Sequence, residues 1–186
     1  MVENETIKGL NNSDNKLKID EYENCTFSNC NFSESSLSDV SFVECVFNDC
    51  DFSLAKLTNT TIRDVNFKNC KLLGLHFDEC NSFLFSAQFH NCHLNLSSFY
   101  KVKLKKTVFK NCRLHEVEFI QTDLTDSLFE NCDLSGAIFE NAVLEKADFR
   151  TAFNYSINPE LNRIKKAKFA LHGLSGLLHK YNIDIE

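Results

Sequence analysis

The sequence predicts an all-β solenoid, a four-sided coil of short strands, and three observations lead to this prediction. A large apolar side chain returns every fifth residue, a small side chain precedes it by two positions, and opposite charges recur 20 positions apart. A spacing of five fits no regular element, because it turns the side chain by about 140° on a helix and reverses its face on a strand. The chain must therefore turn a corner every five residues.

The large residue recurs in two series that together make 12 + 14 = 26 units. The first series is Tyr22, Phe27, Phe32, Leu37, Phe42, Phe47, Phe52, Leu57, Ile62, Phe67, Leu72 and Phe77. The second is Leu84, Phe89, Leu94, Phe99, Leu104, Phe109, Leu114, Phe119, Leu124, Phe129, Leu134, Phe139, Leu144 and Phe149. The spacing between the two series is seven residues, so residues 78–83 contain a two-residue insertion. This break predicts a bulge at a corner or a kink between two stacks of coils.

The residues around each large side chain predict how a unit is built. The position two residues earlier is small, and in an extended segment it lies on the same side as the large residue. The position before the small residue predicts the corner, because Asn often occupies it and tolerates a left-handed backbone. These asparagines are Asn24, Asn29, Asn69, Asn91, Asn111, Asn131 and Asn141.

Charged residues predict four units per turn of the coil. Opposite charges 20 residues apart would stack on neighbouring coils, about 4.8 Å from each other. Such pairs are Asp51 and Lys71, Lys103 and Asp123, Lys106 and Asp126, Lys110 and Glu130, Arg113 and Asp133, Asp126 and Lys146, Glu130 and Arg150, Glu145 and Lys165, and Asp148 and Lys168. Cys30, Cys50 and Cys70 form a column with the same spacing, as do Cys92, Cys112 and Cys132.

The two ends of the chain depart from the repeat. Residues 1–16 lack the pattern and predict a loosely ordered lead-in, so that the repeat region spans 17–169 and begins at Leu17. Residues 153–162 predict a surface loop, after which Ile164 and Phe169 return to phase as a last coil. Residues 170–186 predict a short helix and tail. Its apolar stripe either caps the open end of the solenoid or pairs two molecules, and consists of Leu171, Leu174, Leu177, Leu178 and Tyr181.

Composition bounds the environment and the chemistry of the chain. Its 186 residues are 43% hydrophobic, with no apolar run that could span a membrane, and its start is too polar for a signal peptide. Nine cysteines in the inward small position favour a reducing, cytoplasmic compartment over a disulfide framework. Their columns do not converge as metal ligands must, so no metal or cofactor is expected. The segment Gly173–Gly176 does not have the spacing of a nucleophile elbow, and the sequence predicts a protein that is not an enzyme.

The surface charge is unevenly distributed along the coil. Residues 20–79 hold 11 acidic and 4 basic side chains, a net charge of −7; residues 80–115 hold six basic and no acidic ones; residues 116–148 hold nine acidic and one basic, a net charge of −8. An acidic stripe for binding a partner is predicted from Glu21, Glu23, Asp39, Glu44, Asp64 and Glu79. The alternative interpretation is a solvated face that keeps the rod in solution.

The pattern of a small residue, a polar residue, a Leu or Phe and two variable positions resembles the pentapeptide-repeat family. The resemblance covers about residues 17–149, and Phe27–Ser33 and Asn131–Ala137 are typical segments. It implies a right-handed quadrilateral β-helix with capped ends and often a C-terminal helix that pairs two molecules. In the family's quinolone-resistance branch it implies a rod that mimics DNA and binds type II topoisomerases.

The resemblance leaves more than one function open. The leading hypothesis is binding to DNA gyrase or topoisomerase IV, by partial DNA mimicry, with protection against quinolones. The alternative is a scaffold or regulatory module that binds another protein, which the mixed charge favours. Direct binding of nucleic acid through basic residues 101–113 is disfavoured by the overall net charge of −6, and binding to a membrane is not expected.

Overall fold

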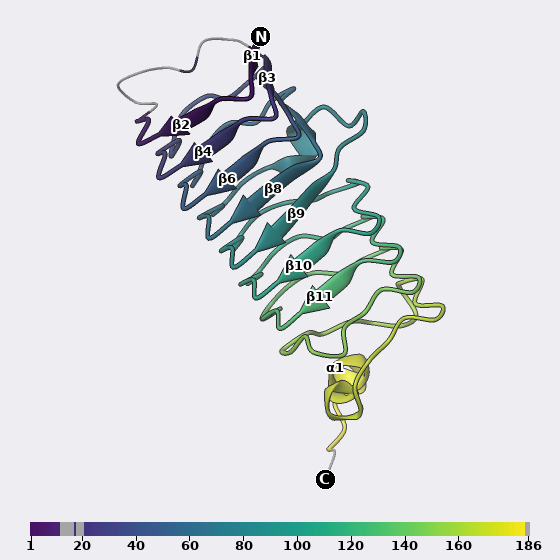
Figure 1. The fold of residues 1–186 in the computed structure, drawn as a ribbon. Helices are drawn as coiled ribbons and strands as arrows, with labels where there is room; N and C mark the ends of the chain where they lie inside the picture. Colours follow the sequence, from purple (N-terminus) through teal and green to yellow (C-terminus); the bar gives the residue numbers. More distant parts are fainter. Residues whose placement is uncertain (12–16, 18–20, 185–186) are drawn as a thin grey trace.

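The computed structural model describes residues 1–11, 17 and 21–184, and within them the chain forms a four-sided parallel β-helix (Figure 1). One side carries a four-stranded sheet in the order β1-β3-β5-β7, and the next carries a seven-stranded sheet in the order β11-β10-β9-β8-β6-β4-β2. Paired strands are one coil apart, as in Tyr22↔Phe42↔Ile62. A coil therefore comprises four units of five residues, and the predicted all-β solenoid is confirmed.

The strands are short because each side of the coil holds only one five-residue unit. They are β1 (Val2–Glu3), β2 (Thr6–Lys8), β3 (Glu21–Glu23), β4 (Thr26–Ser28), β5 (Ser41–Val43), β6 (Val46–Asn48), β7 (Thr61–Arg63), β8 (Val65–Lys68), β9 (Ala87–His90), β10 (Val108–Lys110) and β11 (Leu128–Glu130). The 3₁₀ helices are η1 (Phe77–Glu79), η2 (Leu171–Gly173) and η3 (His179–Tyr181), and the α-helix is α1 (Ser175–Leu178). Isolated parallel bridges continue the same stacking on the other two sides and extend the two sheet-bearing sides toward the C-terminus.

The corners depend on a left-handed residue, as predicted. All seven asparagines proposed for corners have φ between 50° and 55°. At some other corners, such as that of Leu54, a hydrogen bond joins the small residue after the corner to the large residue before it, from Ala55 N–H to the carbonyl of Phe52 at 2.9 Å. Because Asn reaches this conformation with little steric cost, the coil can turn without a glycine at every corner.

The large residues fill the interior in columns of stacked rings. Except for Leu84, every residue of the two predicted series is buried. One column runs along the seven-stranded sheet with centroid distances of 4.6 to 5.5 Å between consecutive rings: Phe27, Phe47, Phe67, Phe89, Phe109, Phe129, Phe149 and Phe169. Rings of neighbouring columns meet edge to face, as Phe109 and Phe119 do at 6.0 Å. Such pairs add about 0.5–1.5 kcal/mol each beyond the burial of apolar area.

The small inward residues also supply hydrogen-bond donors. The hydroxyl of Thr122 donates to the carbonyl of Phe99 at 2.7 Å, and the thiol of Cys132 lies 3.2 Å from the carbonyl of Phe109. Ser, Thr and Cys therefore satisfy buried carbonyl groups that Ala would leave without this contact. The two predicted cysteine columns form one continuous column, because the backbone N–H of His93 donates to the carbonyl of Cys70 across the insertion. Burial raises the pKa of the Cys45 thiol to about 11, which keeps it protonated at neutral pH.

The insertion changes the register from 20 to 22 residues without breaking the seven-stranded sheet, since Phe67 pairs with Phe89. The assignment of Leu84 to the interior is wrong. Leu84 is 56% exposed and turns the chain with φ 58°, whereas Phe85 is 9% exposed and its ring meets Phe77 edge to face at 6.2 Å. The extra residues form the turn that follows η1, so the corner falls at Leu84 and the next residue points inward.

The coil begins earlier than the predicted boundary at Leu17. Strand β1 pairs with β3 and β2 pairs with β4, in registers of 20 residues. Val2, Ile7 and Leu17 pack against the core and are in phase with Tyr22 at intervals of five. One apolar residue per side is enough to hold this first coil in place, because the strands of the next coil supply its backbone hydrogen-bond partners. The prediction of a loose lead-in is therefore corrected for residues 2–11, and residues 12–16 lie outside the described part of the chain.

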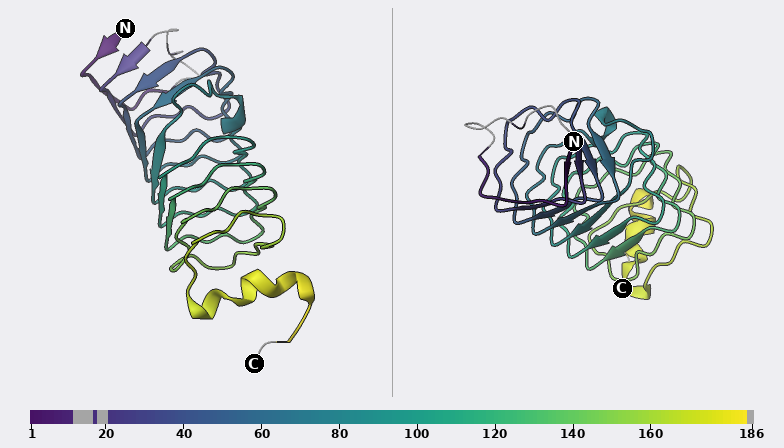
Figure 2. Two further views of the ribbon diagram at one scale, coloured as in Figure 1. Left: turned by 90° about the vertical axis from the view of Figure 1, so that its right-hand side faces the viewer. Right: turned by 45° about the horizontal axis from the view of Figure 1, so that its top comes forward.

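At the other end a last coil forms as predicted, with bridges between Val143 and Arg163 and between Asp148 and Lys168. The segment that follows is a 3₁₀, α and 3₁₀ succession rather than one helix, and it crosses the end of the coil (Figure 2). It docks through two glycines, because Gly173 and Gly176 lie against the ring of Tyr155 and Ile157 N–H bonds to the carbonyl of Gly176 at 2.9 Å.

The predicted leucine stripe covers little of the solenoid end. Only Leu177 packs against the core. The other four residues of the stripe are exposed by 36% to 85%: Leu171, Leu174, Leu178 and Tyr181. The predicted stripe requires one continuous helix, which the segment does not form. The glycine contacts with Tyr155 instead turn another face of the segment toward the coil. Among the described residues, no helix is long and apolar enough to cross a membrane.

A side chain at Gly176 should release this segment from the coil. A Cβ there would lie 2.7 Å from Cδ2 of Tyr155 and closer still to its backbone oxygen. We expect Gly176→Ala to expose the segment from η2 onward to limited proteolysis, while the coil stays intact. Ser175→Ala, a change of the neighbouring residue, is the control and should leave the cleavage rate unchanged. Equal protection of both variants would contradict the glycine contact.

Candidate functional site

Acidic residues occupy all four corners of one stretch of the coil. They are Glu34, Asp39, Glu44 and Asp49, all exposed and all left-handed, with φ of 55°, 63°, 53° and 54°. A left-handed backbone costs an ordinary residue about 1–2 kcal/mol, and Glu gains none of the relief that Asn has. Glu at two of these corners is thus less favourable for folding than Asn, as are Leu54 and Lys106 at other corners. What distinguishes this stretch is that all four of its corners carry a negative charge.

The predicted stripe surrounds the four-stranded sheet. Glu21 and Glu23 flank the buried Tyr22 in β3. Asp39 lies at the corner before β5, Glu44 at the corner after it and Asp64 at the corner after β7. Glu79 lies in η1, on the side that precedes this sheet. An open hollow of about 440 Å³ brings two of the acidic residues together and is lined by Met1, Glu21, Asp39, Ser41, Asn59, Thr61 and Asn81.

Three members of the stripe have local hydrogen-bond partners. Asp39 accepts from the amide of Asn59 at 2.7 Å, and Asp64 accepts from the hydroxyl of Ser86 at 2.7 Å. Glu79 accepts from the hydroxyl of Thr58 at 2.9 Å.

The other three, Glu21, Glu23 and Glu44, have no side-chain partner among the residues that the structure describes. Their carboxylates are the ones available to a second molecule. Glu44 and Asp64 occupy equivalent corners of neighbouring coils, where like charges repel.

The remaining charges partly neutralise one another from coil to coil. Three predicted pairs form, with N–O distances of 3.4 Å for Lys71 and Asp51, 2.7 Å for Lys110 and Glu130, and 3.9 Å for Lys168 and Asp148. Lys103 and Arg113 stack opposite Asp123 and Asp133 as predicted, but no ion pair forms between them among the described residues. The carboxylates contact other side chains instead: Asp123 contacts Lys105 at 3.2 Å, Asp133 contacts His115 at 2.9 Å, and Glu145 contacts Arg163 rather than Lys165 at 2.7 Å.

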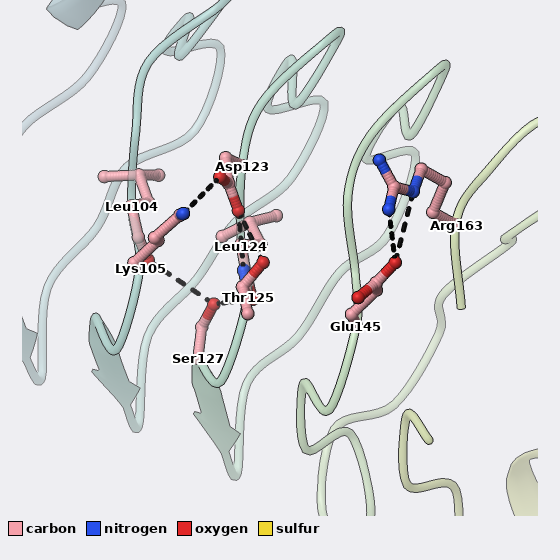
Figure 3. Close-up of polar contacts among 8 residues, drawn as sticks. All are labelled: Leu104, Lys105, Asp123, Leu124, Thr125, Ser127, Glu145 and Arg163. Atoms are coloured by element: carbon pink, nitrogen blue, oxygen red, sulfur yellow. Dashed lines mark hydrogen bonds and ion pairs between the residues drawn. The ribbon is translucent and has the colours of Figure 1, made fainter. Parts of the chain in front are cut away.

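The change of partner has a local cause, which Figure 3 shows for Asp123. Its Oδ1 accepts from the backbone N–H of Thr125 at 3.1 Å and from its hydroxyl at 2.6 Å. These bonds turn the carboxylate along the chain, so its second oxygen lies over Lys105 rather than over Lys103, the residue in register. Asp133 is held in the same way. Although its burial acts in the opposite direction, hydrogen bonds from Ser135, Asn154 and His115 lower the pKa of Asp133 to about 2.

Two acidic residues of the surface, Glu34 and Asp49, are absent from the predicted stripe. Their signal is present in the sequence, since they continue the five-residue spacing of Asp39 and Glu44 in the corner position. The predicted stripe contains residues that stack along one side of the coil and at its two corners. Glu34 and Asp49 lie at the other two corners and were not part of that side. Asp49 also accepts the amide of Asn69 at 3.1 Å, so part of its role is structural.

Comparison with known proteins identifies the repeat. A family model described as the pentapeptide repeat region matches residues 21–83 and 82–153. This chain belongs to the pentapeptide-repeat family. Its buried phenylalanine and leucine columns, small inward residues and left-handed corners are the structural expression of that repeat. Among curated proteins, none matches the sequence.

Solved structures of pentapeptide-repeat proteins resemble the fold. Full-length QnrB1, a plasmid-mediated fluoroquinolone resistance protein, is 20% identical, with a TM-score of 0.48, covering 97% of this chain and 99% of that chain. HetL, a pentapeptide-repeat protein involved in heterocyst differentiation regulation from the cyanobacterium Nostoc sp. strain PCC 7120, is 17% identical, with a TM-score of 0.39, covering 90% of this chain and 84% of that chain. These similarities concern the fold and assign no function.

The strain at Glu44 can be tested by a stability measurement. Asn at this corner would keep φ near 53° at lower steric cost and would remove one of two stacked negative charges. We expect Glu44→Asn to raise the free energy of unfolding by about 1 kcal/mol in a urea titration. Glu23→Gln removes a charge from β3 without changing a corner and should alter stability by less than half as much. A lower stability of Glu44→Asn would contradict the assignment of strain.

Proposed function

We propose that this chain is a non-enzymatic rod that binds a type II topoisomerase, DNA gyrase or topoisomerase IV, and protects it from quinolones. The contact surface in this proposal is the acidic stripe with the acidic corners Glu34 and Asp49. The observation that carries it is the run of four consecutive exposed corners that are all acidic, Glu34, Asp39, Glu44 and Asp49.

The density of charge supports partial mimicry of DNA. Three coils rise by about 14 Å, and duplex DNA of that length carries about 8 phosphate charges. Residues 20–79 carry 11 acidic and 4 basic side chains, a net charge of −7. A surface of this charge complements the basic groove that a topoisomerase offers to DNA, and complementary fields accelerate association.

The basic belt of residues 80–115 favours the alternative, a scaffold or regulatory module for another protein. This belt holds six basic and no acidic residues and interrupts the acidic surface between the two ends of the rod. Residues 116–148 also carry a net charge of −8, but this belt separates them from the N-terminal half, which holds the acidic stripe. On the leading proposal the contact with the topoisomerase is confined to that half.

A supercoiling assay with purified gyrase, with and without a fluoroquinolone, tests the proposal. We expect the wild-type chain to restore supercoiling in the presence of the drug and Glu44→Lys/Asp64→Lys to lose this effect. The matched control is Glu116→Lys/Asp126→Lys, which reverses the same two residue types at exposed corners with φ of 54° and 59°. Failure of the wild type at high excess would support the scaffold alternative, and equal loss in both variants would contradict the placement of the surface.

The exposed apolar side chains at the C-terminal end support a further part of the proposal, a homodimer. Leu171 is 85% exposed, Ile183 55% and Tyr181 53%, and they share one short segment at the end of the rod. Large exposed apolar groups gathered in this way are typical of protein contacts.

The dimer is tested by analytical ultracentrifugation. We expect the wild-type chain to sediment as a dimer at micromolar concentration and Leu171→Ser/Leu174→Ser to sediment as a monomer. Leu54→Ser is the control, because Leu54 is 60% exposed on the side of the coil and away from this segment. A monomeric wild-type protein would contradict the proposal.

A further inference from the structure

A compact basic surface lies on a different corner of the coil from the acidic stripe. It follows the corner after strands β8, β9 and β10, where the seven-stranded sheet meets the next side. On three consecutive coils, a basic residue or histidine stands on each side of a corner asparagine. We call this surface the basic corner; it consists of Lys68, Asn69, Lys71, His90, Asn91, His93, Lys110, Asn111 and Arg113.

Backbone register and an amide ladder hold these residues together. Lys68 and Lys110 are both in register with His90, and Lys71 and Arg113 are both in register with His93. Between the two rows, the amide of Asn91 donates to Oδ1 of Asn69 at 3.0 Å, and the amide of Asn111 donates to Oδ1 of Asn91 at 3.0 Å. Each ladder amide uses one of its two N–H groups in this way, so the ladder fixes the rows and leaves further donors at the surface.

The basic corner has an excess of positive charge. Lys71 pairs with Asp51 and Lys110 with Glu130, but Lys68 and Arg113 have no ion pair within the described part of the chain. Burial lowers the pKa of His90, and the cations Lys68 and Lys110 lower it further against the opposing charge of Glu130. Burial likewise lowers the pKa of His93, together with Arg113, Lys71 and His115. Both imidazoles therefore lie in a positive field that an anion would relieve.

The borders of this surface limit the size of its ligand. Carboxylates lie at both ends along the axis, Asp49 and Asp51 on the N-terminal side and Glu130 and Asp133 on the C-terminal side. Three coils span only about 10 Å between their outer members. A nucleic-acid duplex is wider than this and would bring phosphates against these carboxylates. A few consecutive Asp or Glu side chains fit between them.

We propose that the basic corner binds a short acidic segment of a partner protein. The segment crosses the corner with its carboxylates on Lys68 and Arg113 and on the outward amide groups of Asn91 and Asn111. The corner is convex and exposed, so it cannot enclose a single small anion, and several carboxylates on one chain must act together. This contact is independent of the acidic stripe, and the rod therefore carries two binding surfaces of opposite charge.

The two histidines make the contact dependent on pH. At pH 7.5 both imidazoles are neutral, because burial and, to a lesser extent, the neighbouring cations lower their pKa. At lower pH each one that gains a proton adds a charge to the basic corner, and a bound carboxylate favours that protonation. Glutamate side chains in a peptide, whose ordinary pKa is about 4.3, remain ionised at pH 5.5. Binding of an acidic peptide should therefore tighten between pH 7.5 and pH 5.5.

Fluorescence anisotropy with labelled octaglutamate at low ionic strength tests the inference, using the full-length chain. We expect Lys68→Gln/Arg113→Gln to weaken binding by about fivefold or more, since it removes the two cations without an ion pair. Lys56→Gln/Lys146→Gln is the matched control, because it removes the same charge from exposed sites outside the basic corner. We expect the control to bind like the wild type. Absence of binding by the wild type, or equal loss in both variants, would overturn the inference.

Two further measurements separate the basic corner from a general effect of charge. His90→Gln/His93→Gln should bind normally at pH 7.5 and lose most of the tightening seen in the wild type at pH 5.5. A labelled eight-residue oligothymidylate should bind more weakly than octaglutamate, because its backbone meets the bordering carboxylates. Tighter binding of the oligothymidylate would overturn the inference in favour of a nucleic-acid surface.

Discussion

The left-handed corner is the constraint on which the rest of this structure depends. Each five-residue unit contributes one large side chain to the interior only if the chain turns immediately afterward, and the turn requires a positive φ at one residue. Residues that tolerate this conformation also project from the edges of the coil. The corner therefore sets both how the coil closes and which side chains form its most exposed rows.

Different residues meet this requirement at different cost, and the surface reflects the choice. Along one corner, asparagines from Asn69 to Asn131 join in an amide ladder whose donors all point toward the N-terminal end, where Asp49 accepts the last one. At Glu34 and Glu44 the chain carries charge where Asn would be less strained. Stability and surface charge are thus in competition at the same positions, as is common at functional sites.

The repeat also determines how the two charged surfaces are arranged on the exterior of the coil. Stacking at the spacing of parallel strands repeats each outward position, so a few substitutions at one position create a row. Glu44 with Asp64 and the basic corner around His93 are two such rows, on neighbouring corners of the coil. A rod of this kind presents extended charged surfaces, and in both proposals these surfaces recognise other proteins through charge.

The sequence by itself determined the number of sides, the buried columns and the corner asparagines, because each depends on spacing within one or two coils. It did not determine that Leu84 turns outward while Phe85 fills the interior, since a two-residue insertion can be placed in several ways. It also did not determine that Asp123 pairs with Lys105, because hydrogen bonds to Thr125 redirect the carboxylate. The docking of the C-terminal segment on Tyr155 depended likewise on contacts that no local pattern encodes. Local periodicity fixes which side chains point inward, whereas the directions of outward side chains and the packing of the ends follow from neighbours that meet only in the folded chain.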